Sequence, residues 1–307
     1  MAVNTTLAGL SQTAASNGPD GSADPPSSLD DAIRYALSFI AQLRDGNGFT
    51  AQLGTRNRII NGNFAVNQRA VSGTVTLAAG IYGHDRWKAG ASGCTYTFTT
   101  SGLDTTITIS AGSLVQVIEG LNVEGGTYTM SWSGTAQGKI NGGAFAATGV
   151  QATGVTAGTN LTVELNVGSI SKVQVEPNST ASQFERRPYS SELLACQRYY
   201  QTSYQAQAAG TASAASGRLV NFSSSTSAYV AFPIFFSPVL RVAPTLTVYN
   251  PTTGASGSVR NESAGTDFAS ATLGTSTTSQ NFAAVTTISA PPANAVMAMH
   301  YTASAEL

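Results

Sequence analysis

The feature that most constrains this fold is a succession of short segments, from residue 57 onward, in which apolar and polar residues alternate. Residues 94–100 read CTYTFTT and residues 161–167 read LTVELNV. Neighbouring side chains on a strand point to opposite faces of its sheet, so this alternation predicts half-buried strands. Clusters of Gly, Asn and Ser separate the segments at short intervals. The pattern is typical of antiparallel sandwiches and lacks the helical crossovers of a doubly wound fold.

The predicted strands fall into two groups. The first group comprises residues 94–100, 105–110, 114–118, 127–132, 161–167 and 171–176, and the second comprises residues 216–222, 227–236, 245–249, 257–260, 268–273, 282–288 and 296–303. Residues 186–200 interrupt the alternation and predict a short connecting helix, capped by Ser190 or Ser191. We therefore expect a mostly β chain with two antiparallel, jelly-roll-like β-sandwich domains.

One helix is predicted before the strands, over residues 28–45. Ser28 and Asp31 form a capping-box pattern, and Gly46 follows the last turn. The apolar positions follow the rhythm of a coiled-coil seam, and they are Leu29, Ile33, Ala36, Ile40 and Leu43. A helix of about 27 Å is too short for a stable coiled coil by itself. It packs either on its own chain or, as we favour, in a short oligomeric bundle or docking contact.

These patterns divide the chain into three parts. Residues 1–48 form an arm and the helix, and the Ser-, Ala-, Asn-, Gly- and Pro-rich residues 1–26 have too few apolar side chains to fold alone. Residues 49–190 form the first sandwich. Residues 191–307 form the connector helix and the second sandwich. We expect the arm to be extended and held by another protein.

Charge excludes some classes of partner. With 15 basic and 16 acidic residues, the net charge of -1 provides no field for nucleic acid or an anionic membrane. The N-terminus lacks a secretory signal, and no apolar run is long enough for a membrane helix, so we expect a soluble protein made in the cytoplasm. The cysteines Cys94 and Cys196 are expected to be reduced and buried, with a disulfide between them as the alternative.

No catalytic, metal or cofactor site is predicted. The histidines are His84 and His300, and the carboxylates include no pair singled out for glycoside hydrolysis. His84 and Asp85 are neighbours in sequence and should point apart, which does not make a triad. We interpret this segment as structural, with Trp87 in the core and Asp85 and Arg86 ion-paired nearby.

Carbohydrate contact would require exposed aromatic rings, and four are candidates. They are Tyr82, Trp87, Tyr249 and Phe268, of which Tyr82 follows Gly80 in a predicted loop and should be the most exposed. Core packing is the alternative for the other three.

Residues 185–189, ERRPY, hold the densest charge cluster. We interpret it as arginines paired with carboxylates such as Glu176 or Glu192, with anion binding as the alternative.

Three phrases carry a resemblance to a known family. Residues 57–69 read NRIINGNFAVNQR, residues 173–200 read VQVEPNSTASQFERRPYSSELLACQRYY, and residues 301–307 read YTASAEL. Together they resemble the β-sandwich module and terminus of bacteriophage and prophage tail-fibre proteins. Residues 29–46 also resemble the N-terminal region by which phage fibres join the tail.

This resemblance implies a non-enzymatic part of a virion tail, synthesised in the host cytoplasm. Residues 1–48 would bind other tail proteins, the chain would form a homotrimer, and the distal second sandwich would face a host-surface glycan or protein. No cofactor, nucleic acid or membrane insertion is implied. We expect host contact at the loops 250–257, 261–267 and 274–281, unless these only solubilise the tip. The alternatives are a free carbohydrate-binding lectin and a polysaccharide-degrading tailspike.

Overall fold

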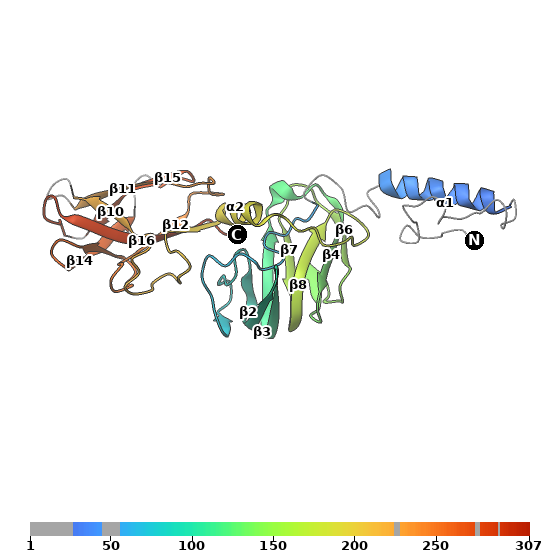
Figure 1. Cartoon of the computed structure of the whole chain (residues 1–307), viewed down its shortest axis with the longest axis horizontal. Helices are drawn as coiled ribbons and strands as arrows, with labels where there is room; N and C mark the ends of the chain where they lie inside the picture. The colour runs from blue at the N-terminus through green and yellow to red at the C-terminus, as the bar shows by residue number, and fades with distance from the viewer. Residues whose placement is uncertain (1–26, 45–55, 224–227, 274–276, 288) are drawn as a thin grey trace.

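The computed structural model describes residues 27–44, 56–223, 228–273, 277–287 and 289–307. Helix α1 (Ser27–Arg44) and two groups of strands follow one another along the long axis of the molecule (Figure 1). The prediction of a mostly β chain with two antiparallel sheets is confirmed. The expected arm, residues 1–26, lies outside the described residues.

The first sheet is built from eight strands of the described chain. They are β1 (Val75–Leu77), β2 (Lys88–Ser101), β3 (Asp104–Ile118), β4 (Gly126–Ser133), β5 (Gly138–Ile140), β6 (Val150–Val155), β7 (Leu161–Leu165) and β8 (Gly168–Glu176). The order is β1-β2-β3-β8-β4-β6, and β7 joins β3 to β5. Strand β3 pairs with β8 through residues 107–109 and with β7 through residues 114–118, so one long strand serves both parts of the sheet.

The second sheet also has eight strands in the described ranges. They are β9 (Tyr200–Thr202), β10 (Leu219–Phe222), β11 (Tyr229–Phe235), β12 (Thr245–Tyr249), β13 (Ser258–Asn261), β14 (Thr266–Leu273), β15 (Asn281–Thr287) and β16 (Val296–Ser304). The order is β10-β16-β13-β14-β15-β11, and β16 also pairs with β12 and β9. Strand β16 is therefore the central strand of this domain. It runs back toward the first domain (Figure 1).

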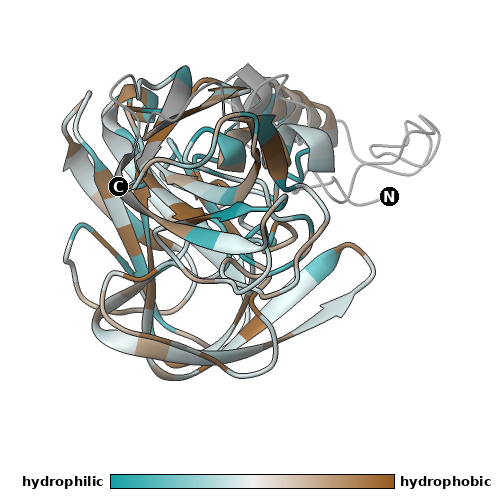
Figure 2. Ribbon diagram, turned by 90° about the vertical axis from the view of Figure 1, so that its left-hand side faces the viewer, coloured by the Kyte–Doolittle hydropathy of each residue, from teal (hydrophilic) through white to brown (hydrophobic). Residues whose placement is uncertain are grey.

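Each domain has its own apolar core, as the alternation predicted. Fully buried side chains of the first core include Trp87, Ile107 and Val173, and those of the second include Val259 and Met297. Apolar and polar residues alternate along the strands of the second domain, which faces the viewer in Figure 2. Burial of the apolar side chains stabilises each sheet. The central strand β16 is buried on both faces, since residues 297–303 are all buried.

The pairing of strands β2 and β3 is interrupted by a bulge where their backbones come close together. Gly112 has φ +72°, and a Cβ atom there would lie 2.0 Å from the carbonyl oxygen of Gly93. The register between the strands shifts on both sides of this point. Two segments predicted as separate strands, 105–110 and 114–118, are thus one strand that bends at a glycine.

The helix boundaries correct two capping predictions. Helix α1 begins at Ser27, so Ser28 lies inside its first turn. Helix α2 (Tyr189–Gln197) has Pro188 at its N-cap without a side-chain capping bond, so neither Ser190 nor Ser191 caps it. Proline is tolerated at this helix start because its missing N–H breaks no intrahelical hydrogen bond there.

Two further expectations concern cysteines and membrane spans. Cys94 and Cys196 are both free and buried, as the favoured interpretation expected. Within the described part of the chain, neither helix combines the length and apolar character needed to cross a bilayer.

Candidate binding site

The junction between the two β domains is crossed twice by the chain. Strand β9 leaves α2, and β16 returns beside it with Thr302 opposite Thr202 and Ser304 opposite Tyr200. The amide of Ala305 then donates to the carbonyl of Tyr199 over 2.8 Å. Two antiparallel passes resist bending better than one linker, because backbone hydrogen bonds join them.

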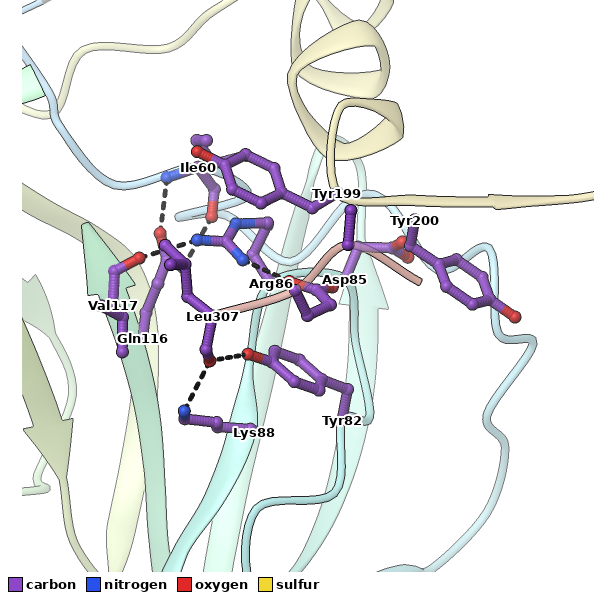
Figure 3. Close-up of polar contacts among 12 residues, drawn as sticks. Ile60, Tyr82, Asp85, Arg86, Lys88, Gln116, Val117, Tyr199, Tyr200 and Leu307 are labelled. Carbon is purple, nitrogen blue, oxygen red and sulfur yellow. Dashed lines mark hydrogen bonds and ion pairs between the residues drawn. The ribbon is translucent and has the colours of Figure 1, made fainter. Parts of the chain in front are cut away.

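Beyond β16 the chain is held by charged groups of the first domain. The carboxylate of Glu306 pairs with Arg69 over 3.0 Å and with the buried guanidinium of Arg86. Arg86 also donates to the carbonyl of Val117 over 2.7 Å, and its guanidinium carbon lies 3.6 Å from the ring centroid of Tyr199. Figure 3 shows the Tyr199 ring above Arg86, between α2 and the last residues of the chain.

The backbone oxygen of Leu307 completes this contact. It accepts hydrogen bonds from the Tyr82 hydroxyl and from Lys88 Nζ, the latter over 2.6 Å (Figure 3). Burial and the nearby Glu306 carboxylate raise the pKa of Tyr82 to about 12. Burial and the adjacent Arg86 lower the pKa of Lys88. The junction is therefore a structural contact in which most of the polar groups named here bind other parts of the chain, although the buried Nε of Arg86 has no hydrogen-bond partner among the described residues.

A pocket of about 430 Å³ opens elsewhere on the first domain. Its lining comes from four places that are distant in sequence: residues 63–67, His84, the β2–β3 hairpin at residues 98–105, and the connector at residues 186–192. Buried Phe64 and half-buried Phe98 line its interior. Leu103 and Tyr189 stand at its margin with 74% and 60% of their surface exposed. This size and this mixture of aromatic and polar groups are typical of small-ligand sites.

His84 lines the pocket as a neutral imidazole. Its Nδ1 lies 3.0 Å from the Tyr96 hydroxyl, and its ring packs edge-to-face at 4.6 Å from that of Phe98. Burial lowers the pKa of His84 to about 4. Asp85 points to different partners, since it accepts from Gln68 and pairs with Arg69. The side chains of these two neighbours therefore point apart, as their adjacent positions in the sequence predicted.

The arginines beside the pocket are already neutralised. Arg187 donates to the carbonyls of Ile59 and Asn57 and pairs with Glu192. Arg186 donates to the carbonyl of Leu103 and pairs with Asp104. The structural interpretation of the ERRPY cluster is confirmed for Glu192, whereas Glu176 pairs with Arg56 instead. A guanidinium whose charge is already paired with a carboxylate offers less to an incoming anion.

The four predicted sugar-contact residues are not brought together. Trp87 is fully buried and donates its Nε1 hydrogen to the carbonyl of Asn61, so it belongs to the core and not to a binding surface. Tyr82 is half-buried in the junction. Tyr249 packs edge-to-face on Tyr204 at 5.8 Å, and half-buried Phe268 packs against the second core. The sequence did not predict pocket residues such as Phe98 and Tyr189, because they become neighbours only in the folded chain.

The loops predicted for host contact lie at different places on the second domain. Strand β14 begins at Thr266, so 261–267 is a tight turn, and Glu262 donates its amide to Val296 at the far end of β16. The amides of Phe236 and Leu240 donate to Gln280 and Ser279. Residues 274–276 of the loop 274–281 lie outside the described residues. Residues 279–280 of it lie at the end near the connector, because the amide of the neighbouring Arg241 donates to the carbonyl of Arg198. The three loops therefore do not form one tip.

The part of the α1 seam that the structure describes is exposed. Leu29 and Ile33 are 59% and 52% exposed, and Ala36 is exposed too. The side chains of Ile40 and Leu43 lie outside the described residues. Phe39, off the seam, is buried. Exposed apolar residues in a row on one helix are typical of an interaction surface.

Comparisons with known proteins add no family. No protein-family model matches the chain, and no curated protein matches it significantly. Among the described residues, moreover, no group of three or more His, Cys, Asp or Glu side chains is placed to hold a metal ion.

Proposed function

We propose that this chain is a non-enzymatic adhesion component of a phage tail, joined to the particle by residues 1–48 and facing the host with its second β domain. The observation that carries the proposal is the doubly crossed junction. It holds two β domains in series, with the turn after β13 and the segment 289–295 at the end far from the first domain (Figure 1). A fibre has to hold its distal domain away from the particle in this way.

Self-association of α1 is part of the same proposal. An uncovered apolar seam on a short helix is stabilised when copies of the chain bring their seams together. A homotrimer would also present several distal domains at once, so that weak contacts with a host glycan or protein combine. The tail-fibre phrases in the sequence support this arrangement.

The decisive experiment is to locate the chain in intact particles. Gold-labelled antibody against the second domain, viewed by negative-stain electron microscopy, should mark tail appendages at a distance from the tail body. Antibody against residues 27–44 should mark positions close to the tail body or be blocked by it. Particles that carry no label, together with free chain in the lysate, would contradict the tail role and favour a free lectin.

A further inference from the structure

We propose that the pocket lined by His84, Phe98 and Tyr189 binds an uncharged pyranose ring of a glycan. The proposed tail role supplies only the source of that glycan, a host surface, and the chemistry of the pocket is argued independently of it. The pocket lies on the first domain, away from the loops that were expected to recognise a host.

The first step is charge. The pocket's basic neighbours are Arg186 and Arg187, which are paired with Asp104 and with Glu192 and engaged by backbone carbonyls. His84 is uncharged at neutral pH because burial disfavours its protonated form. An anionic ligand would find no free positive charge here, and a cationic one would find only a carboxylate that is already paired. A neutral ligand has the least to lose on leaving water.

The second step is the mixed character of the lining. Phe64, Phe98 and Leu103 offer apolar surface, and the exposed ring of Tyr189 stands at the entrance. The lining also contains polar groups that can accept further hydrogen bonds. Asn63 uses its Nδ2 on the carbonyl of Leu103, and the hydroxyls of Thr100 and Thr105 bond each other over 2.9 Å, which leaves acceptor sites on all three.

The third step is the match to a ligand class. A pyranose has an apolar C–H face and a rim of hydroxyl groups, so it can lie against an aromatic ring while its hydroxyls donate to amide and hydroxyl oxygens. A purely aliphatic ligand would remove those oxygens from water without offering them a donor, which disfavours its binding. A volume of about 430 Å³ leaves room for one or two such rings.

The test is binding by the purified full chain in calorimetry and saturation-transfer NMR. The probes are methyl glucoside, galactoside and mannoside, each beside its uronic-acid counterpart, which differs only in carrying a carboxylate at C6. At least one neutral glycoside should bind one-to-one, and its uronide should bind about tenfold more weakly or not at all. Failure of all three neutral probes, or equal binding of a neutral probe and its uronide, would overturn the proposal.

Two substitutions on strand β2 locate the binding. Thr100→Trp fills the pocket from an exposed strand position and should weaken binding by about tenfold or more. Thr99→Trp is its control, because Thr99 is also exposed but points to the opposite face of the same strand. Equal binding by wild type and Thr100→Trp would place the sugar elsewhere and sink the assignment.

A second pair covers the case in which Thr100→Trp does not fold. Tyr189→Ala removes the ring at the entrance, and Leu194→Ala removes an exposed apolar side chain of the same helix outside the pocket. Only the first should weaken glycoside binding, severalfold. Binding of 1-heptanol with no glycoside binding would assign the pocket to apolar ligands and overturn the sugar class. Antibody labelling of particles tests the tail role without the pocket, so the two proposals can fail separately.

Discussion

At the scale of single residues, burial decides what each titratable group can do. His84 is 2% exposed, and its ring is held by Tyr96, Phe98 and Phe64. The protonated ring would lose its hydration there without gaining a carboxylate, because the neighbouring Asp85 faces Gln68 and Arg69. His84 is therefore a neutral side chain packed in the domain, and it destabilises the folded state only when it is protonated.

We predict that His84 makes stability depend on pH between about 6.5 and about 4. The pKa is lowered from 6.5 to about 4 in the folded chain, so below pH 6.5 the unfolded chain binds the proton more readily. The contribution is complete above pH 6.5 and falls by about 3 kcal/mol as the pH reaches 4. Burial also lowers the pKa of His300, so denaturation curves of wild type and His84→Phe should be compared across this range. A pH dependence that is identical in both would contradict the prediction.

At the scale of elements, backbone freedom allows the strands to approach each other. The bulge between β2 and β3 requires a residue with positive φ and no side chain at position 112. The sequence pattern predicted both halves of β3, but the alternation breaks at the bulge, which made one strand resemble two. Short strands such as β1, β5 and β9 were missed because three residues carry too little alternation.

Replacing Gly112 with Ala should destabilise the first domain by more than the strain of positive φ alone. Its matched control is Gly158→Ala, where φ is +73° and nothing lies within 4 Å of the added methyl group. Gly158→Ala should lower the free energy of unfolding by about 1 kcal/mol. Gly112→Ala should lower it by at least about twice as much, because its methyl group meets the carbonyl of Gly93. Urea denaturation measures both. Equal costs would show that the strands separate without penalty.

The seam of α1 provides a second prediction at this scale. Leu29→Asp with Ile33→Asp should reduce the proposed oligomer to monomer, because each charge buried in a helix interface costs several kcal/mol. Ser38→Asp adds a charge to the same helix away from the seam and should leave the mass unchanged. Light scattering with size exclusion gives the mass of each variant. An oligomer that survives the double substitution would assign assembly to the β domains.

At the scale of the whole molecule, the junction couples two cores that are otherwise separate. Each sheet buries its own apolar residues, and the domains are joined by α2, β9, the end of β16 and the ion pairs of Glu306. Arg241 strengthens this return path by donating to the carbonyls of Ala305 and Glu306 over 2.9 and 3.0 Å. The relative placement of the domains therefore depends on a few charged contacts.

Reversing the charge of Glu306 should uncouple the domains. Glu306→Lys places a cation between Arg69 and Arg86, both largely buried, and we expect a loss of about 3–5 kcal/mol in the free energy of unfolding. Small-angle scattering should show a broader distribution of domain separations, and proteases should cut near residues 198–204. Glu262→Lys, which breaks the more exposed pair with Arg218, is the control and should change neither. Unchanged scattering from Glu306→Lys would place the coupling elsewhere.

The sequence by itself determined most of the longer strands, both helices and the division into two β domains, because periodicity is a local property of the chain. It also indicated that the ERRPY arginines pair with carboxylates such as Glu192, but it left Trp87 open between the core and a sugar contact until the structure placed it in the core. Only the tertiary structure decided where the candidate site lies. Asn63, Phe98 and Tyr189 meet because sheet pairing and the connector fold distant segments together. The same is true of Glu306 and Arg86, 220 positions apart, whose pairing depends on where β16 ends in space.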